Sequence, residues 1–359
     1  MMKLVGNDIK KEVKDEIFNC LYSDDNTMLG KLSNSDRVYI LYLLKQYYLE
    51  LRKKIDISDN ITFGLELEFD SMFSDIIDEN LYNIVGDDWC VVPEGSIING
   101  GEINSPILTD TEKNWKDLMT VCSILGKYAS STESTGAHVH LGIQILGNNP
   151  KYWRNFALLW STYENIIFRF LYGEYVSPRS RINDYATPVS KDYITNLDRI
   201  EDRANYINAN YMFKLFDSGN QNIKLRRRKS VNFTNVSDLP PYVYDRIIKM
   251  NTVEFRSPNG TFNPVIWQNN VNLLVKLMLY CKSDKFNEEI IKRRMNKIIE
   301  DNILSNLYKY SFINYDQAIE FADLIFDNNL DKIYFLRQYI KDGTLSNKLF
   351  IRSECFTRR

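Results

Sequence analysis

The stretch from residue 135 to 142 contains the only two histidines of the chain and reads Thr135-Gly136-Ala137-His138-Val139-His140-Leu141-Gly142. Its alternation of apolar and polar residues predicts a β-strand that carries His138 and His140 on one face. Side chains two residues apart on a strand lie roughly 6.5 Å from each other, so both imidazoles could serve one site. The alternative is a solvated strand face on which both histidines are ordinary polar residues.

A second alternating segment, Phe-Gly-Leu-Glu-Leu-Glu-Phe-Asp, covers residues 63–70. Its period of two predicts a strand with Glu66, Glu68 and Asp70 on the polar face. Three shorter segments show the same pattern. Their predicted polar faces carry Glu102 and Asn104, then Ser230, Asn232 and Thr234, then Thr252, Glu254 and Arg256.

The polar faces of these strands are rich in carboxylates and imidazoles. They contain little of the Thr or Lys that is expected on a strand face that is only solvent-exposed. A half-buried strand with a solvated polar face is still the alternative for each segment. If the strands are neighbours, four carboxylates converge, and their repulsion raises their pKa values unless a cation neutralises them. Such a site suits Mg²⁺, or Mn²⁺ where an imidazole takes part. We therefore predict a concave sheet that holds two or three divalent cations, an arrangement that usually serves phosphate chemistry.

In their order and spacing these motifs resemble the amidoligase family. The matching motifs are Gly-x-Glu-x-Glu-Phe at 64–69, Gly-Glu-Ile-x-Ser-Pro at 101–106, Thr-Gly-x-His-Val-His-Leu-Gly at 135–142 and Thr-Val-Glu-Phe-Arg at 252–256. The resemblance runs from about Phe63 to Trp267. The family belongs with glutamine synthetase and the glutamate–cysteine ligases in the carboxylate–amine ligase superfamily. It implies an α+β fold: a glutamine synthetase-like curved antiparallel β-sheet backed by helices.

The resemblance also implies roles for individual residues. The implied metal ligands are Glu66, Glu68, Glu102, His138 and Glu254. His140 would lie near the transferred phosphate, and Arg256 would contact the carboxylate substrate or its acyl phosphate. The implied cofactors are ATP and Mg²⁺ (or Mn²⁺). The implied reaction phosphorylates a small-molecule or peptide carboxylate and then forms an amide with an amine.

Further cations are needed to hold the phosphates. Arg179 and Arg181 lie in one short basic segment, and residues 226–229 form a second basic run. We predict catalytic roles for Arg181 and Lys229. We predict nucleotide binding for Arg179, Arg228 and Asn232. A nucleic-acid patch at 224–229 is the other interpretation, but a formal net charge of −2 weakens it.

One departure from the family pattern occurs where relatives usually carry Asp-Gly-Ser. Here the segment reads Glu94-Gly95-Ser96. If this acid holds a substrate ammonium group, the longer side chain would change the choice of substrate. The alternative is that Glu94 and Gly95 only form a turn.

Three parts are expected along the chain: an N-terminal helical extension (1–58), the amidoligase catalytic domain (59–282) and a C-terminal helical region (283–359). Helices are predicted at 10–22, 35–54 (with Ser35 as N-cap), 111–128, 150–171, 290–304 and 315–326. The aromatic residues Phe312, Phe321 and Phe326 are predicted to be core.

Composition favours a cytoplasmic enzyme of a phage or bacterium. The chain is 44% hydrophobic and 26% charged, which argues against disorder. The five cysteines are scattered and predict reduced thiols. No apolar signal core or membrane-length apolar run is present, so no membrane partner is expected, and a homo-oligomer stays open.

Two other function classes agree less well with the sequence. A metal-dependent hydrolase or iron oxygenase is disfavoured because the third histidine of a cupin-type site and the His-Glu-x-x-His motif of zinc proteases are both absent. A catalytically repurposed binding module would be expected to have lost ligands, whereas every motif acid and both histidines are present. The sequence contains no P-loop. This does not argue against ATP binding, because the fold that the chain resembles binds ATP without one.

Overall fold

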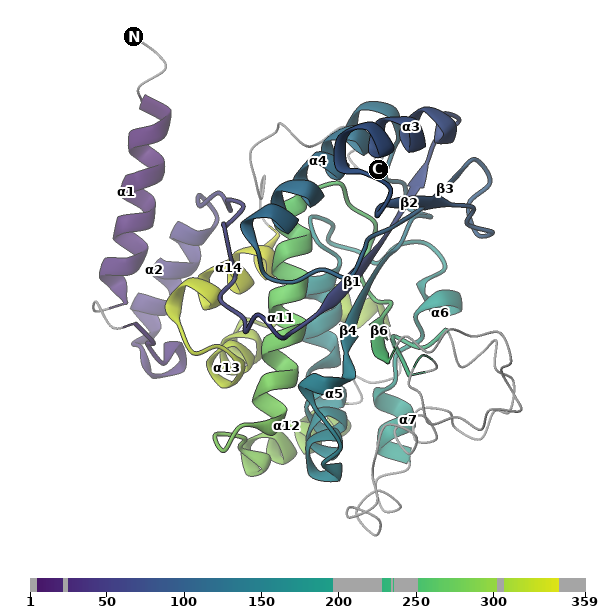
Figure 1. Cartoon of the computed structure of the whole chain (residues 1–359). Coiled ribbons are helices and arrows are strands. Elements are labelled where there is room, and N and C mark those ends of the chain that lie inside the picture. The colour runs from purple at the N-terminus through teal and green to yellow at the C-terminus, as the bar shows by residue number, and fades with distance from the viewer. Residues whose placement is uncertain are drawn as a thin grey trace.

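The computed structural model describes residues 5–21, 25–195, 228–233, 235, 251–301 and 307–341. Within these ranges six strands form one antiparallel sheet with helices against one of its faces (Figure 1). The strands are β1 (Phe63–Asp70), β2 (Cys90–Val92), β3 (Gly100–Asn104), β4 (Ala137–Gly142), β5 (Val231–Asn232) and β6 (Thr252–Phe255). Their order across the sheet is β2-β3-β1-β4-β6-β5. The prediction of a mixed fold with an antiparallel sheet backed by helices is therefore confirmed.

Helices lie before, between and after the strands. Before and among the first strands they are α1 (Val5–Cys20), α2 (Asn34–Leu44), α3 (Ser74–Val85) and α4 (Glu112–Tyr128). Between β4 and β5 they are α5 (Pro150–Leu171), α6 (Ile182–Tyr185) and α7 (Ser190–Thr195). After β6 they are α11 (Pro264–Lys282), α12 (Glu288–Glu300), α13 (Tyr315–Ile325) and α14 (Asn329–Ile340). Short 3₁₀ helices cover Leu29–Lys31, Ile143–Ile145 and Leu307–Ser311. None of the helices in the described ranges has the length and apolar character needed to span a membrane.

The core forms where the apolar faces of the strands meet the helices. Phe63 and Phe69 of β1 are buried, as are the apolar residues of β4 and β6. The ring of Phe63 stacks on Trp115 of α4 with centroids 5.2 Å apart, and Phe255 of β6 lies 5.3 Å from Trp160 of α5. Because strand side chains alternate, burying this face turns the polar residues of the same strands away from the helices.

The two long helices behind the sheet begin at matching caps. Asn149 accepts a hydrogen bond from the backbone N–H of Lys151, and Asn263 accepts one from that of Val265, with a proline at the start of each helix. An Asn cap followed by Pro satisfies free N–H groups and presets the backbone for a helix. α5 has the predicted bounds, and α4 begins one residue later than predicted because Thr111 is its N-cap.

The predicted helix over 35–54 is wrong beyond residue 44. α2 ends at Leu44, and its N-cap is Ser33 rather than Ser35. The following segment is held by side chains from elsewhere in the chain. The backbone N–H of Glu50 donates to the Tyr334 hydroxyl at 3.4 Å, and that of Arg52 donates to Gln268 Oε1 at 2.8 Å. These long-range bonds replace the i→i−4 bonds that a helix would require.

Two expectations about side-chain direction are also wrong. Ser230 was expected to share the polar face with Asn232, but its hydroxyl donates to Glu164 of α5, on the helical side of the sheet. The reason is that β5 begins only at Val231, so strand alternation does not extend to Ser230. Phe312 is 62% exposed rather than part of the core, whereas Phe321 and Phe326 are buried. Thr234 and residues 302–306 lie outside the described residues.

Candidate active site

Strand register brings six of the predicted residues together on the polar face of the sheet. The directly opposed pairs are Glu68 with Glu102, Glu66 with His138, and His140 with Glu254. Opposed residues in an antiparallel pair have Cβ atoms roughly 5 Å apart, close enough for their side chains to touch. Four strands that are far apart in sequence, β3, β1, β4 and β6, thus supply one compact cluster.

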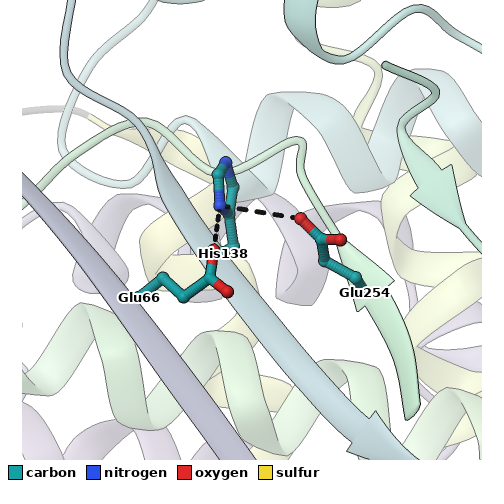
Figure 2. Close-up of side chains that lie close together, drawn as sticks. All are labelled: Glu66, His138 and Glu254. Atoms are coloured by element: carbon teal, nitrogen blue, oxygen red, sulfur yellow. Dashed lines mark hydrogen bonds and ion pairs between the residues drawn. The ribbon is translucent and has the colours of Figure 1, made fainter. Parts of the chain in front are cut away.

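His138 lies at the centre of this cluster and is 2% exposed. Its Nδ1 is 2.5 Å from Glu66 Oε2 and 3.7 Å from Glu254 Oε1 (Figure 2). The same nitrogen is 4.0 Å from Glu102 Oε2, and Nε2 is 3.6 Å from Glu68 Oε1. Although it is buried, Nε2 has no hydrogen-bond partner among the residues that the structure describes. An unpartnered imidazole nitrogen facing carboxylates is the donor arrangement that a cation would complete.

Among the described residues, two groups of ligand atoms could each hold a metal ion. One consists of Glu66, His138 and Glu254, and the other of Glu68, Glu102 and His138. Within each group the candidate ligand atoms lie within 4.8 Å of one another. The structure therefore brings together all five residues predicted as metal ligands. Carboxylate oxygens with one imidazole form a donor set that suits Mg²⁺ or Mn²⁺.

Glu66 is bound by both histidines. His140 Nε2 lies 2.7 Å from Glu66 Oε1, and His140 Nδ1 lies 3.2 Å from the hydroxyl of Thr252. Burial alone would raise the pKa of Glu66, but its hydrogen bonds with His138 and His140 outweigh burial and hold that pKa well below its usual range. Burial alone would lower the pKa of His140, but the hydrogen bond to Glu66 and the charge of Glu254 raise it.

Glu102 is in the opposite situation because, among the described residues, only His138 lies within ion-pair distance of it, at 4.0 Å. Burial, and then repulsion from the surrounding carboxylates, raises the pKa of Glu102 to about 9. A protonated Glu102 relieves the repulsion in the metal-free cluster. A divalent cation would relieve it instead, with release of that proton.

Glu254 is held from two sides. Asn232 of β5 donates a hydrogen bond of 2.6 Å to Glu254 Oε2, and the guanidinium of Arg256 donates to Oε1. Burial would raise the pKa of Glu254, but the charge of Arg256, together with those of His140 and His138, outweighs burial and lowers this pKa. The Nε of Arg256 donates to the carbonyl of Tyr185 at 3.1 Å, which fixes the guanidinium beside the cluster. Asn232, predicted for nucleotide binding, thus contacts a candidate metal ligand.

Glu68 is held by Arg179 and by the backbone of Gly136. Arg179 is 4% exposed, and its Nη1 lies 3.7 Å from Glu68 Oε2, which also accepts a hydrogen bond from the Gly136 N–H. A Cβ at residue 136 would lie 1.2 Å from Arg179 Nη1. Only glycine therefore leaves room for the guanidinium at this place, which explains the glycine in the motif.

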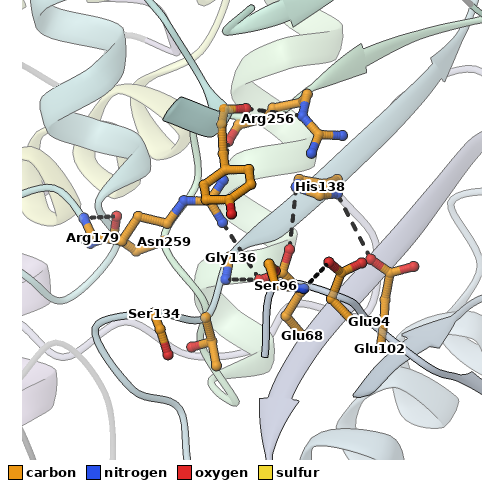
Figure 3. A network of polar contacts seen from close by, with 12 residues as sticks. Glu68, Glu94, Ser96, Glu102, Ser134, Gly136, His138, Arg179, Arg256 and Asn259 are labelled. Atoms are coloured by element: carbon orange, nitrogen blue, oxygen red, sulfur yellow. Dashed lines mark hydrogen bonds and ion pairs between the residues drawn. The ribbon is translucent and has the colours of Figure 1, made fainter. Parts of the chain in front are cut away.

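A cavity of about 310 Å³ adjoins the cluster (Figure 3). Its walls are formed by Glu68, Glu94, Ser96, Ser134, Arg179, Tyr185, Arg228 and Arg256. Arg228, predicted for nucleotide binding, lies in this wall. Ser134 and Tyr185 were missed as site residues, since neither belongs to a strand or a motif. Glu94 was signalled by its departure from the family pattern.

Both interpretations of Glu94 agree with its geometry. Its Oε1 accepts a hydrogen bond of 2.8 Å from the backbone N–H of Ser96, which fixes the turn. The same carboxylate lines the cavity, close to Glu102 (Figure 3). The turn therefore positions the acid at the site.

Two residues predicted to be catalytic are not part of the cavity wall. The side chain of Arg181 is 63% exposed and pairs with Asp184 at 3.0 Å. Lys229 Nζ lies 2.5 Å from Asp192 Oδ2 of α7. The remaining cations of the basic run, Arg226 and Arg227, lie outside the described residues.

The fold and the site together define a mixed α/β protein with a candidate divalent-metal centre on an antiparallel sheet. A family model described as "Putative amidoligase enzyme" matches residues 82–278, which is more than half of the chain. The chain belongs to this amidoligase family, which indicates an enzyme of the ligase type. The matched segment includes Glu102, both histidines, Glu254 and Arg256, and begins after β1. No curated protein sequence matches the chain significantly.

Proposed function

We propose that the protein is an ATP- and Mg²⁺-dependent carboxylate–amine ligase with a glutamine synthetase-like fold. It would form an amide or peptide bond through an acyl phosphate, and Mn²⁺ could replace Mg²⁺. Membership of the amidoligase family supports the ligase class. The observation that carries the metal- and phosphate-dependent part is the convergence of four carboxylates on His138, whose buried Nε2 has no hydrogen-bond partner within the described ranges.

The residues present fit a divalent cation. Glu66 accepts the hydrogen of His138 Nδ1 in the tautomer that leaves the Nε2 lone pair free to coordinate, the usual orientation of a metal-binding histidine. Glu68 and Glu102 would then complete one site with His138, and Glu66 with Glu254 would form the second. When bound, Mg²⁺ would offset the negative charge of the phosphate oxygens.

The other residues of the site would position the reactants and stabilise charge. The guanidinium of Arg256, fixed by Glu254 and the Tyr185 carbonyl, stands at the cavity wall, where it would orient a substrate carboxylate. Arg179 holds Glu68 in place from its buried position. His140 is predicted to lie near the transferred phosphate, and Glu66 and Thr252 hold its ring. Since an acyl phosphate is already activated, the remaining task is to bring the amine to it.

Release of ADP and phosphate from ATP tests the proposal. Purified protein is incubated with Mg²⁺, ATP, pooled carboxylic acids and pooled amines, and products are identified by mass. We expect release that requires both an acid and an amine, that stops in Glu68→Gln and that persists in the control Glu79→Gln, an exposed residue of α3. Release that needs no amine would indicate a hydrolase. Absence of both turnover and metal-dependent ATP binding would contradict the proposal.

A further inference from the structure

The charges on the cavity wall are unevenly paired. Glu68 lies within ion-pair distance of Arg179, and Arg256 pairs with Glu254. The two remaining charged residues of the wall, Glu94 and Arg228, form no ion pair with each other or with any other part of the chain that the structure describes. The cavity therefore presents one negative and one positive group that have no ion-pair partner among the described residues.

Arg228 is held in position, and its guanidinium makes no hydrogen bond with the residues that the structure describes. Its guanidinium carbon lies 5.4 Å from the ring centroid of Tyr185, a cation–π contact. Its carbonyl accepts a hydrogen bond of 2.7 Å from the Thr187 N–H, which ties the backbone beside β5. Stacking leaves the N–H groups in the guanidinium plane available, and this planar fork matches a carboxylate.

Glu94 is held in a corresponding way. The bond from the Ser96 N–H engages Oε1 and fixes the side chain, and no further hydrogen bond of this carboxylate exists within the described ranges. Glu94 stands beside Glu102 and therefore next to the metal cluster (Figure 3). An ammonium group bound here would lie close to the place where the proposed acyl phosphate forms.

We infer that the amine substrate is a zwitterion, an amino acid or a terminal residue of a peptide, with its amino group at Glu94 and its carboxylate at Arg228. This inference rests on the proposed ligase function. Charge-assisted hydrogen bonds at both ends would fix the orientation of such a molecule. A polyamine would instead bring a second cation against Arg228. A nucleotide phosphate at Arg228 would leave Glu94 without a partner and add repulsion from it, so the carboxylate of the amine substrate fits better.

Direct binding tests this inference without turnover. Saturation-transfer NMR on the full chain with Mg²⁺ compares pooled amino acids and dipeptides with putrescine and ethylamine, which lack the carboxylate, and with acetate, which lacks the amine. We expect the wild type to bind zwitterions at least about tenfold more tightly than either set, since each set lacks one of the two charge-assisted contacts. Arg228→Gln and Glu94→Gln should each lose that preference, and Arg228→Lys should keep part of it. Arg293→Gln, which changes an exposed arginine of α12, is the matched control.

Several outcomes would overturn the inference. These are amines that bind the wild type as tightly as zwitterions do, no zwitterion binding at all, or an Arg228→Gln protein that keeps the preference. Loss of ATP binding with intact zwitterion binding in Arg228→Gln would assign this arginine to the nucleotide. Thermal melting shows whether each variant is folded. If Arg228→Gln is unfolded, the binding preferences of Arg228→Lys and Glu94→Gln test the inference in its place. Zwitterion binding without any ADP release would contradict the ligase function but leave this subsite standing.

Discussion

Replacing Glu102 by Gln is expected to flatten the pH dependence of stability of the metal-free protein. The folded chain keeps a proton on Glu102 because the pKa of this carboxyl is raised to about 9 from its ordinary 4.5. The unfolded chain has released that proton above its ordinary pKa. The folded state therefore binds more protons in this window, and the free energy of unfolding falls as pH rises.

The size of the effect follows from the number of protons released. For one such proton, the free energy of unfolding falls by about 1.4 kcal/mol for each pH unit between the two pKa values. This amounts to roughly 2–3 kcal/mol from about pH 6 to about pH 8. The raised pKa of His140 acts in the same direction. The lowered pKa values of Glu66 and Glu254 lie below this window and do not oppose it.

Urea unfolding in the presence of a chelator measures this dependence. The wild type, Glu102→Gln and the exposed control Glu79→Gln are compared over a pH series, and then again with excess Mg²⁺. We expect the wild type and the control to lose stability as pH rises, the Gln variant to lose much less, and Mg²⁺ to reverse the trend in the wild type. A metal-free wild type whose stability is flat or rises over this range, or a Gln variant with the full slope, would refute the reasoning.

Three further substitutions give measurable outcomes. Asn232→Ala removes the 2.6 Å hydrogen bond to Glu254, so Mn²⁺ affinity by calorimetry should fall roughly 10–100-fold, and unchanged affinity would show that Asn232 does not support the metal. Gly136→Ala places a Cβ where the Arg179 guanidinium lies; we expect a stability loss of about 1–3 kcal/mol by urea unfolding and loss of ADP release, and full activity would contradict the need for glycine. Trp160→Ala empties the core behind β6 and should cost about 3–5 kcal/mol by urea unfolding, while the Mn²⁺ affinity of the remaining folded protein stays within about twofold. A much smaller loss of stability would show that the core behind β6 tolerates the cavity.

Much of the cluster was predictable because strand alternation is a local property. The period of two in residues 63–70 and 135–142 already places Glu66 and Glu68, and likewise both histidines, on shared faces. That these faces meet depended on the order of motifs and the family resemblance, since alternation alone does not define which strands pair. The observed register places Glu66 directly opposite His138.

The parts that sequence reasoning missed depend on contacts between distant segments. Tyr185 enters the cavity wall in a short helix, where its carbonyl accepts a hydrogen bond from Arg256, seventy-one residues away. The segment after Leu44 has helical spacing of apolar residues, but Gln268 and Tyr334, distant in sequence, bind its backbone in another conformation. Lys229 adjoins the site in sequence, yet Asp192 of α7, thirty-seven residues away, pairs with it. No local pattern contains this information.

The most direct test of the central claim is to locate the metal ions. Crystals grown with Mn²⁺ and a non-hydrolysable ATP analogue would be measured for anomalous diffraction at the manganese edge. We expect anomalous peaks within coordination distance of Glu68, Glu102 and His138 and of Glu66 and Glu254, with the analogue's phosphates bound to the same ions. Analogue density without any peak in this cluster, or manganese bound only elsewhere, would contradict the claim that these residues form a catalytic metal centre.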